Sequence, residues 1–326
     1  MTQEELEAGA GMPLGVVNAY LPEEQVMRVG VPHRGGRLAF HAFNQDYPVM
    51  VSANAFWDTK TLSFKKPTYT DLDECDVALD SAGFTAMHLW KSKGKQRGMA
   101  GVFPWTYEEY LEFATSFGAA WYSQPDLCCE PEIAKDAEAI DYRIRVTATL
   151  LEGCLYVLHR WHQMLADQGA SPSVIASMAP PPVPVLQGWS VSDYLKSLDL
   201  MQEVWARWTP WLAPPALIGL GSVCRRNLKD PEHGLYALLA ALEGRLPKGA
   251  KLHLFGVKGA ALAEVKMLPW VASADSMAFD LSSRIEARKN GKSNTMAHRA
   301  STMTSWMSAA ARRMAPAAGD QFRLAF

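Results

Sequence analysis

The sequence predicts a parallel α/β protein, and a (β/α)8 barrel of the TIM type is the best interpretation. Short, nearly continuous apolar runs alternate with helical patterns along the chain, which is typical of a parallel sheet covered on both faces. The 326 residues are enough for one large barrel. A doubly wound open sheet is the alternative. However, the chain contains neither G-x-G-x-x-G nor G-x-x-x-x-G-K-[ST], so dinucleotide and P-loop sites lose their usual support.

The chain divides into a lead-in and a barrel. Residues 1–44 form the lead-in, which includes a hairpin, because segments 37–43 and 48–52 are apolar or alternating and flank a polar Asn-Gln-Asp turn. Residues 45–326 form the barrel domain. Its expected strands are segments 48–52, 76–79, 119–123, 183–186, 216–220, 251–255 and 271–274, which leaves the eighth strand unplaced.

Helical periodicity and stop signals give the remaining elements. The expected helices are segments 106–117, 132–168, 192–208, 231–246, 260–268 and 295–314. Segment 171–184 is rich in Ser and Pro, so we expect a connector without a helix there. The basic segment 91–98 and the basic segment that follows Asp275 are expected to be exposed loops.

Composition and charge narrow the class of protein. The chain is 48% hydrophobic and 20% charged, as is usual for a globular protein with a sizeable core. Its formal net charge of -2 means that contact with nucleic acid would need a local basic face. The acidic start MTQEELEAGAG does not resemble a signal peptide, and no apolar run reaches the roughly 20 residues of a membrane span. Five cysteines without C-x-x-C spacing suit reduced thiols. We therefore expect a cytoplasmic protein with no membrane association.

Polar residues and glycines follow the predicted strands. They are Asp80-Ser81, Asp126, Gln187-Gly188, Gly219-Leu220, Gly256 and Asp275. The carboxyl ends of barrel strands converge on one mouth, where substrates bind. Carboxylates and a carboxamide offer donors and acceptors to the edge of a heterocycle, and glycines let the backbone approach it. Each residue alone fits a turn or a helix N-cap, but the set suits recognition of a purine.

The ordered set resembles the motifs of the tRNA-guanine transglycosylase superfamily. Asp80-Ser81-Ala82-Gly83-Phe84 resembles D-S-G-G-[FY], with Ala82 in place of the first glycine. The other matches are Asp126-Leu127-Cys128 with D-E-C, Leu186-Gln187-Gly188 with V-Q-G, Gly219-Leu220 with G-L, Phe255-Gly256-Val257 with M-G-V, and Ala274-Asp275-Ser276 with F-D-[CS]. The spacing from Gly256 to Asp275 also matches, and the resemblance runs from about residue 45 to 300.

Two departures from the superfamily are informative. Its zinc site, a C-x-C-x-x-C plus a His after the nucleophile, is missing, since no cysteine follows Cys224 and His298 alone cannot supply four ligands. We therefore expect a barrel without the zinc subdomain, and no metal or cofactor. Segment 221–226, after the G-L pair, contains no acid to meet a cationic substrate. These losses resemble the DNA-modifying branch of phages and bacteria, the DpdA proteins, which insert 7-deazaguanines into DNA.

The resemblance implies a glycosyltransferase of the pentosyltransferase (EC 2.4.2) type. It would exchange guanine in DNA for a 7-deazaguanine, with the 7-cyano form expected, through a covalent link between Asp275 and deoxyribose. Asp80 would be the general acid and base. The implied base contacts are Ser81, Phe84, Asp126, Cys128, Gln187, Gly188, Gly219, Leu220 and Gly256. DNA and a free 7-deazapurine are the implied partners, and a homo-oligomer is left open.

Two basic clusters flank the predicted catalytic strand ends. One is Lys91, Lys93, Lys95 and Arg97, and the other is Arg284, Arg288, Lys289, Lys292 and Arg299. Both are predicted to contact phosphates, although each alone equally fits a solvated surface. Arg225-Arg226 is a weaker third candidate. His159 and His162 fit packing better than a metal site.

Two other functions fit the sequence. One is a tRNA-guanine transglycosylase that has lost its zinc. The other is a non-catalytic subunit that binds nucleic acid beside an active partner, but the presence of both Asp80 and Asp275 argues against it.

Overall fold

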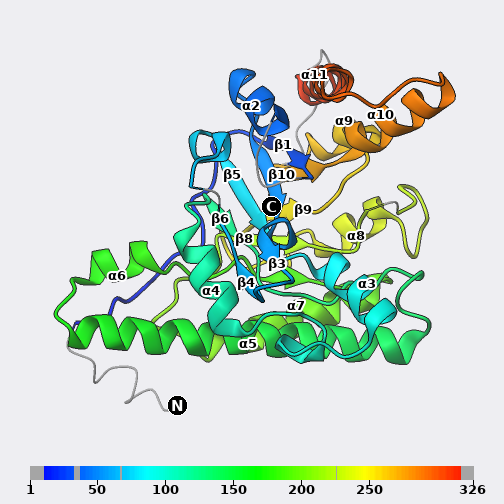
Figure 1. Ribbon diagram of the computed structural model, residues 1–326. Helices are drawn as coiled ribbons and strands as arrows, with labels where there is room; N and C mark the ends of the chain where they lie inside the picture. Colours follow the sequence, from blue (N-terminus) through cyan, green and yellow to red (C-terminus); the bar gives the residue numbers. More distant parts are fainter. Residues whose placement is uncertain (1–10, 33–36, 67, 225, 317–326) are drawn as a thin grey trace.

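The computed structural model describes residues 11–32, 37–66, 68–224 and 226–316 (Figure 1). Within these residues eight parallel strands form one sheet, in the order β6-β5-β2-β1-β10-β9-β8-β7. The strands are β1 (Val26–Val31), β2 (Val49–Ser52), β5 (Val77–Asp80), β6 (Trp121–Tyr122), β7 (Val185–Leu186), β8 (Leu217–Leu220), β9 (Lys251–Leu254) and β10 (Val271–Ser276). A separate hairpin joins β3 (Trp57–Asp58) to β4 (Ser63–Phe64).

The sheet curls so that its two end strands meet. The Val183 amide donates to Tyr122 O at 2.8 Å, and the Gln124 amide donates to Val183 O at 2.9 Å, beside the ends of β6 and β7. The buried Gln124 side chain reinforces this junction, because its Oε1 accepts from the Val185 amide at 3.1 Å. Each strand neighbours the previous strand of the sheet in the chain, and β1 pairs with β10. This is the arrangement of a TIM-like barrel.

Helices surround the sheet. They are α2 (Arg37–Asn44), α3 (Gly83–Lys93), α4 (Tyr107–Ser116), α5 (Ala137–Asp167), α6 (Pro172–Met178), α7 (Val191–Ala206), α8 (Leu235–Leu242), α9 (Leu262–Val265), α10 (Ala278–Lys289) and α11 (Met296–Met314). In Figure 1, α5 and α7 lie on one side of the sheet, and α10 and α11 lie together on the other. In the described part of the chain, no helix is both long enough and apolar enough to cross a membrane.

Side chains alternate between the two faces of each strand and form two apolar cores. Val49 and Val51 of β2 pack in the large cluster between sheet and helices, whereas Met50 packs in a smaller cluster. Ala78, Trp121 and Leu217 belong to the smaller cluster as well. Successive strand residues point to opposite faces, so the smaller cluster fills the barrel interior. Burial on both faces explains why the strands are continuous apolar runs in the sequence.

Several expectations for the local structure are wrong. Segment 37–43 forms α2 rather than a hairpin strand, because Leu38, Ala39 and Ala42 share one buried helical face. The unplaced eighth strand is β1, so the sheet begins before residue 45. The Ser/Pro-rich connector contains α6, which tolerates Pro172 in its first turn because the amide there has no helical partner.

The two basic segments also differ from the expected loops. Lys91 and Lys93 lie in the last turn of α3, and Arg284, Arg288 and Lys289 lie on α10. Basic residues in a last helical turn are favoured there by the helix dipole.

Candidate active site

Asp80 is the last residue of β5 and lies at the carboxyl end of the sheet. The turn that follows requires a left-handed residue, and Ala82 has φ +72°. This conformation costs a residue other than glycine about 1–2 kcal/mol, which accounts for the glycine of the superfamily motif at this position. The turn brings the Ala82 amide within 3.0 Å of Asp80 Oδ2, to which it donates.

The surroundings of Asp80 change its acidity. Burial, followed by the charges of Asp126 and Asp275, raises the pKa of Asp80 from 3.8 to about 7, against the opposing hydrogen bond from Ala82. A carboxyl group with this pKa can both give and take a proton near neutral pH. Asp80 therefore has the acidity that a general acid and base needs.

Asp126 follows β6 and is held on both sides. Ser81 Oγ donates to its Oδ1 at 2.9 Å, and Gln187 Nε2 donates to its Oδ2. Gly83 lets Asp126 pack closely against the start of α3, because a Cβ at residue 83 would lie 2.4 Å from Asp126 O and 2.8 Å from Asp126 Oδ1. Burial and the charge of Glu130 raise the pKa of Asp126 to about 6, although both hydrogen bonds oppose this shift. The carboxyl groups of Asp80 and Asp126 thus share one buried acidic region.

The network continues through Ser222 and Glu130, which are not among the predicted base contacts. Ser222 Oγ lies 2.6 Å from Gln187 Oε1 and 3.1 Å from Glu130 Oε2. Its single hydroxyl hydrogen can be donated to one of these two oxygens at a time. The Cys129 amide donates to Ser222 Oγ at 2.7 Å. Glu130 therefore brings an acid to the loop after β8, where the sequence of segment 221–226 contains none. The sequence offered no signal for this contact, because the two residues lie on different loops.

Asp275 lies in β10 and its side chain is mostly buried. The Gly256 amide donates to its Oδ1 at 2.8 Å, and His253 Nε2 lies 3.4 Å from the same oxygen. Gly256 has φ +73°, and a Cβ there would lie 2.9 Å from Cys224 Cβ, so glycine is required. The match of Gly256 with the superfamily glycine therefore has a physical reason.

The remaining predicted base contacts have different surroundings. Phe84 is exposed at the start of α3, and its ring centroid lies 4.5 Å from that of His88. Leu220 and Cys128 are buried in the large core, and burial raises the pKa of the Cys128 thiol well above its usual range. Gly188 and Gly219 allow close packing, because a Cβ would lie 2.6 Å from Asp193 Cβ and 2.5 Å from the Phe255 ring, respectively. Contact of a base with these residues stays a prediction.

Arg226 is a structural residue rather than a candidate for phosphate contact. It is 2% exposed and donates to the carbonyls of Ser222, Gly188 and Trp189. Its guanidinium also lies 4.1 Å from the centroid of the Trp189 ring. Arg226 therefore ties together the loops after β7 and β8, and Arg225 lies outside the described residues.

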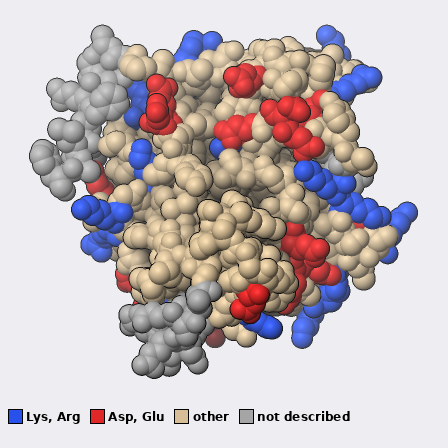
Figure 2. Space-filling model, turned by 90° about the vertical axis from the view of Figure 1, so that its left-hand side faces the viewer, with Lys and Arg blue, Asp and Glu red and all other residues tan. Residues whose placement is uncertain are grey.

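Several basic residues of the predicted phosphate clusters have protein partners. Arg97 pairs with Glu109, Arg284 and Arg299 both pair with Asp280, and Lys91 donates to Glu132 O. The exposed remainder is Lys93, Lys95, Arg288, Lys289 and Lys292. On the face shown in Figure 2, Lys and Arg lie mostly toward the edge, with acidic groups between them.

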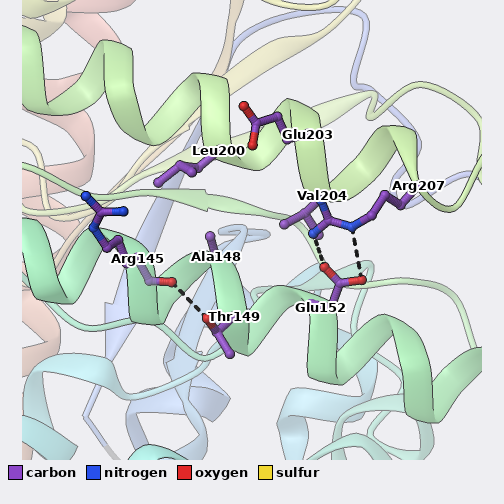
Figure 3. A pocket seen from close by; sticks show the side chains of 8 residues that line it. All are labelled: Arg145, Ala148, Thr149, Glu152, Leu200, Glu203, Val204 and Arg207. Atoms are coloured by element: carbon purple, nitrogen blue, oxygen red, sulfur yellow. Dashed lines mark hydrogen bonds and ion pairs between the residues drawn. The ribbon is translucent and has the colours of Figure 1, made fainter.

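Two cavities lie away from the carboxyl groups of Asp80, Asp126 and Asp275. A groove of about 300 Å³ between α5 and α7 is crossed by the ion pair of Arg207 with Glu152 (Figure 3). A cavity of about 140 Å³ is lined by Arg28, Asp76 and Trp121, among others. Neither is lined by Asp80 or Asp275.

The two histidines of α5 are packing residues, as expected. His162 bonds to Ala179 O and to the Trp211 indole, and the His159 ring packs on Trp211. Within the described ranges, no three His, Cys, Asp or Glu side chains are grouped to hold a metal ion.

A curled parallel sheet with acidic side chains gathered at its carboxyl end defines the class, a TIM-like barrel protein with a candidate site at the mouth. Comparison with protein families narrows this class. Residues 56–323 match the family described as DpdA, DeoxyPurine in DNA protein A, so the chain belongs to that family. The resemblance to this branch of the superfamily is therefore confirmed. A search of curated proteins found no match.

Proposed function

We propose that the protein exchanges guanine in DNA for a 7-deazaguanine by way of a covalent bond between Asp275 and deoxyribose. The observation that carries this proposal is the carboxyl pair at the mouth: Asp80 has a pKa of about 7 and responds to the charge of Asp275. The description of the family, deoxypurine in DNA, supports DNA as the nucleic acid.

In the first step, a carboxylate oxygen of Asp275 attacks C1′ of the target nucleotide as the bond to guanine breaks. The proton of Asp80 passes to the leaving guanine, which takes the bonding electron pair with it. The products are free guanine, an Asp275–deoxyribose ester and an ionised Asp80.

In the second step, the incoming 7-deazaguanine gives its N9 proton to Asp80 and attacks C1′. The ester bond breaks and its electron pair returns to Asp275. Both catalytic groups are restored, so the exchange needs no water and no cofactor.

The network around Asp126 would read the base. An ionised carboxylate accepts the N1 and 2-amino hydrogens of guanine, and the Gln187 amide offers a donor to O6. In the structure these two side chains bind each other, so base entry would exchange that contact for contacts to the base. The 7-cyano form of 7-deazaguanine remains our preferred substrate. The aminomethyl form is cationic, and the carboxyl group of Glu130 beside Ser222 could bind it, so the two forms should be compared as substrates.

The target base must leave the stack to reach buried carboxylates. The exposed side chains Lys93, Lys95, Arg288, Lys289 and Lys292 are our candidates for phosphate contact. Met277, which caps α10, and Leu281 and Ile285 on α10 are spaced about one helical turn apart and are each more than 40% exposed, so they add apolar surface to the helix that follows Asp275.

A base-exchange assay tests the proposal. Labelled guanine, 7-cyano-7-deazaguanine and the aminomethyl form are offered to DNA and to tRNA, and nucleoside mass spectrometry detects the product. We expect incorporation into DNA and none with Asp275→Asn. Incorporation into tRNA alone would favour the zinc-less tRNA enzyme. Absence of exchange in both nucleic acids, with DNA still bound, would favour a non-catalytic subunit.

A further inference from the structure

His253 is a buried polar residue in the middle of an apolar strand. It lies in β9, is 0% exposed, and its ring is enclosed by Trp121 and Phe255, with centroids 4.7 and 4.6 Å away. A polar ring inside an apolar barrel is costly unless its nitrogens have partners. The partners of His253 therefore indicate why it is there.

The two ring nitrogens face two residues of the adjacent strand β10. Nδ1 lies 2.8 Å from Ser273 Oγ, and Nε2 lies 3.4 Å from Asp275 Oδ1. Because the carboxylate can only accept, Nε2 carries the hydrogen, and Nδ1 accepts from the Ser273 hydroxyl. The carboxylate of Asp275 thereby fixes the tautomer, and the Ser273 hydroxyl, which can donate or accept, satisfies Nδ1.

The ring is neutral. Burial and the nearby charge of Arg28 lower the pKa of His253, although Asp275 opposes the shift. Arg28 itself is paired with Asp76. The ring thus offers Asp275 a dipole without adding a positive charge.

We propose that His253 is a positioning residue for Asp275, and this rests on the proposed function. The Gly256 amide binds Oδ1, and His253 Nε2 lies 3.4 Å from the same oxygen without completing a hydrogen bond, so both dipoles act on Oδ1 and Oδ2 is left as the oxygen that attacks C1′. His253 has no exposed surface and acts only through Asp275.

The same contact assists the second step. In the ester, Oδ1 is the carbonyl oxygen, and negative charge returns to it as the C1′–Oδ2 bond breaks. An N–H aimed at an oxygen where charge develops stabilises the transition state. Loss of this donor should therefore slow breakdown of the ester more than its formation.

The test compares His253→Leu, which removes the donor, with His253→Gln, whose amide nitrogen can replace Nε2. Met50→Leu, in the same interior cluster, is the matched packing control. We measure kcat, the KM values for DNA and free base, and the fraction of protein that carries DNA after denaturation. His253→Leu should lower kcat about 10-fold to 100-fold. Its adduct fraction should rise and its KM for DNA should fall together with kcat, because slower breakdown makes the ester accumulate, while His253→Gln and Met50→Leu keep most of the wild-type rate.

Contrary results are distinct. A wild-type kcat in His253→Leu, or exchange and adduct falling in parallel, would refute the role of His253. If His253→Leu does not fold, His253→Phe, which keeps a ring but removes the donor, takes its place, and an unchanged kcat in that variant would refute the role equally. If the wild-type protein forms no adduct, or Asp275→Asn still exchanges bases, the proposed function itself fails.

Discussion

The raised pKa of Asp80 predicts a dependence of stability on pH. In the unfolded chain this carboxyl group has its usual pKa of 3.8, whereas in the fold its pKa is about 7. A shift of about three pKa units corresponds to about 4 kcal/mol. Because the folded pKa is the higher one, the fold loses this stability as the pH rises from about 4 through 7.

Asp80→Asn should remove the penalty, because an amide has a similar shape and stays neutral. The stability of the variant relative to wild type should increase by about 2–3 kcal/mol between pH 5 and pH 8. Urea unfolding at several pH values measures this difference, and the same variant at pH 4 is its own control. A difference that stays constant with pH, or is larger at pH 5, would refute the argument. On the proposed function the variant should also lack base exchange, since the proposed proton donor is gone.

Three further predictions follow from single contacts. Gly83→Ala should lower base exchange at least tenfold, because its Cβ would displace Asp126. Ala82→Gly at the adjacent position should keep activity and stabilise the fold by up to about 1 kcal/mol. Initial rates and thermal unfolding measure both effects, and an active Gly83→Ala would contradict the close contact of Gly83 with Asp126. Arg226→Met should destabilise the fold by about 3 kcal/mol or more, because it leaves several buried carbonyls unpaired. Urea unfolding measures this change, and a value below about 1 kcal/mol would contradict the structural role of Arg226 between the loops after β7 and β8. Arg288→Ser with Lys289→Ser should reduce the salt dependence of DNA binding by about two charges in titrations at increasing salt, whereas Arg160→Ser on the distant α5 should not; equal slopes would exclude α10 as a phosphate contact.

The strand ends could be predicted because two local signals coincide there. An apolar run buried on both faces is followed at once by a polar residue or a glycine, as at Leu79-Asp80 and Leu186-Gln187. The element at 37–43 could not be predicted in this way. A short apolar run fits a strand or a helix equally, and only packing on the sheet decides for α2.

The contacts within the site follow from tertiary structure. Glu130 reaches Ser222 across two loops, and Arg226 joins the loops after β7 and β8. Spacing along the chain contains no information about such pairs. His253 did leave a signal, because a histidine interrupts the apolar run Leu252–Leu254 just before the Gly256 motif.

The pairing of β1 with β10 has a consequence for when the protein becomes active. Arg28 of β1 is the register partner of Asp275, so the strand that carries Asp275 lies beside the first strand of the sheet. During synthesis on the ribosome, β1 leaves the exit tunnel long before β10 exists, and one edge of the growing sheet stays unpaired until then. Closing such a long loop is slow, which makes this pairing a late event. Asp275, the proposed nucleophile, thus reaches its place only when the barrel closes, so a partly made chain would not carry out the proposed attack on DNA.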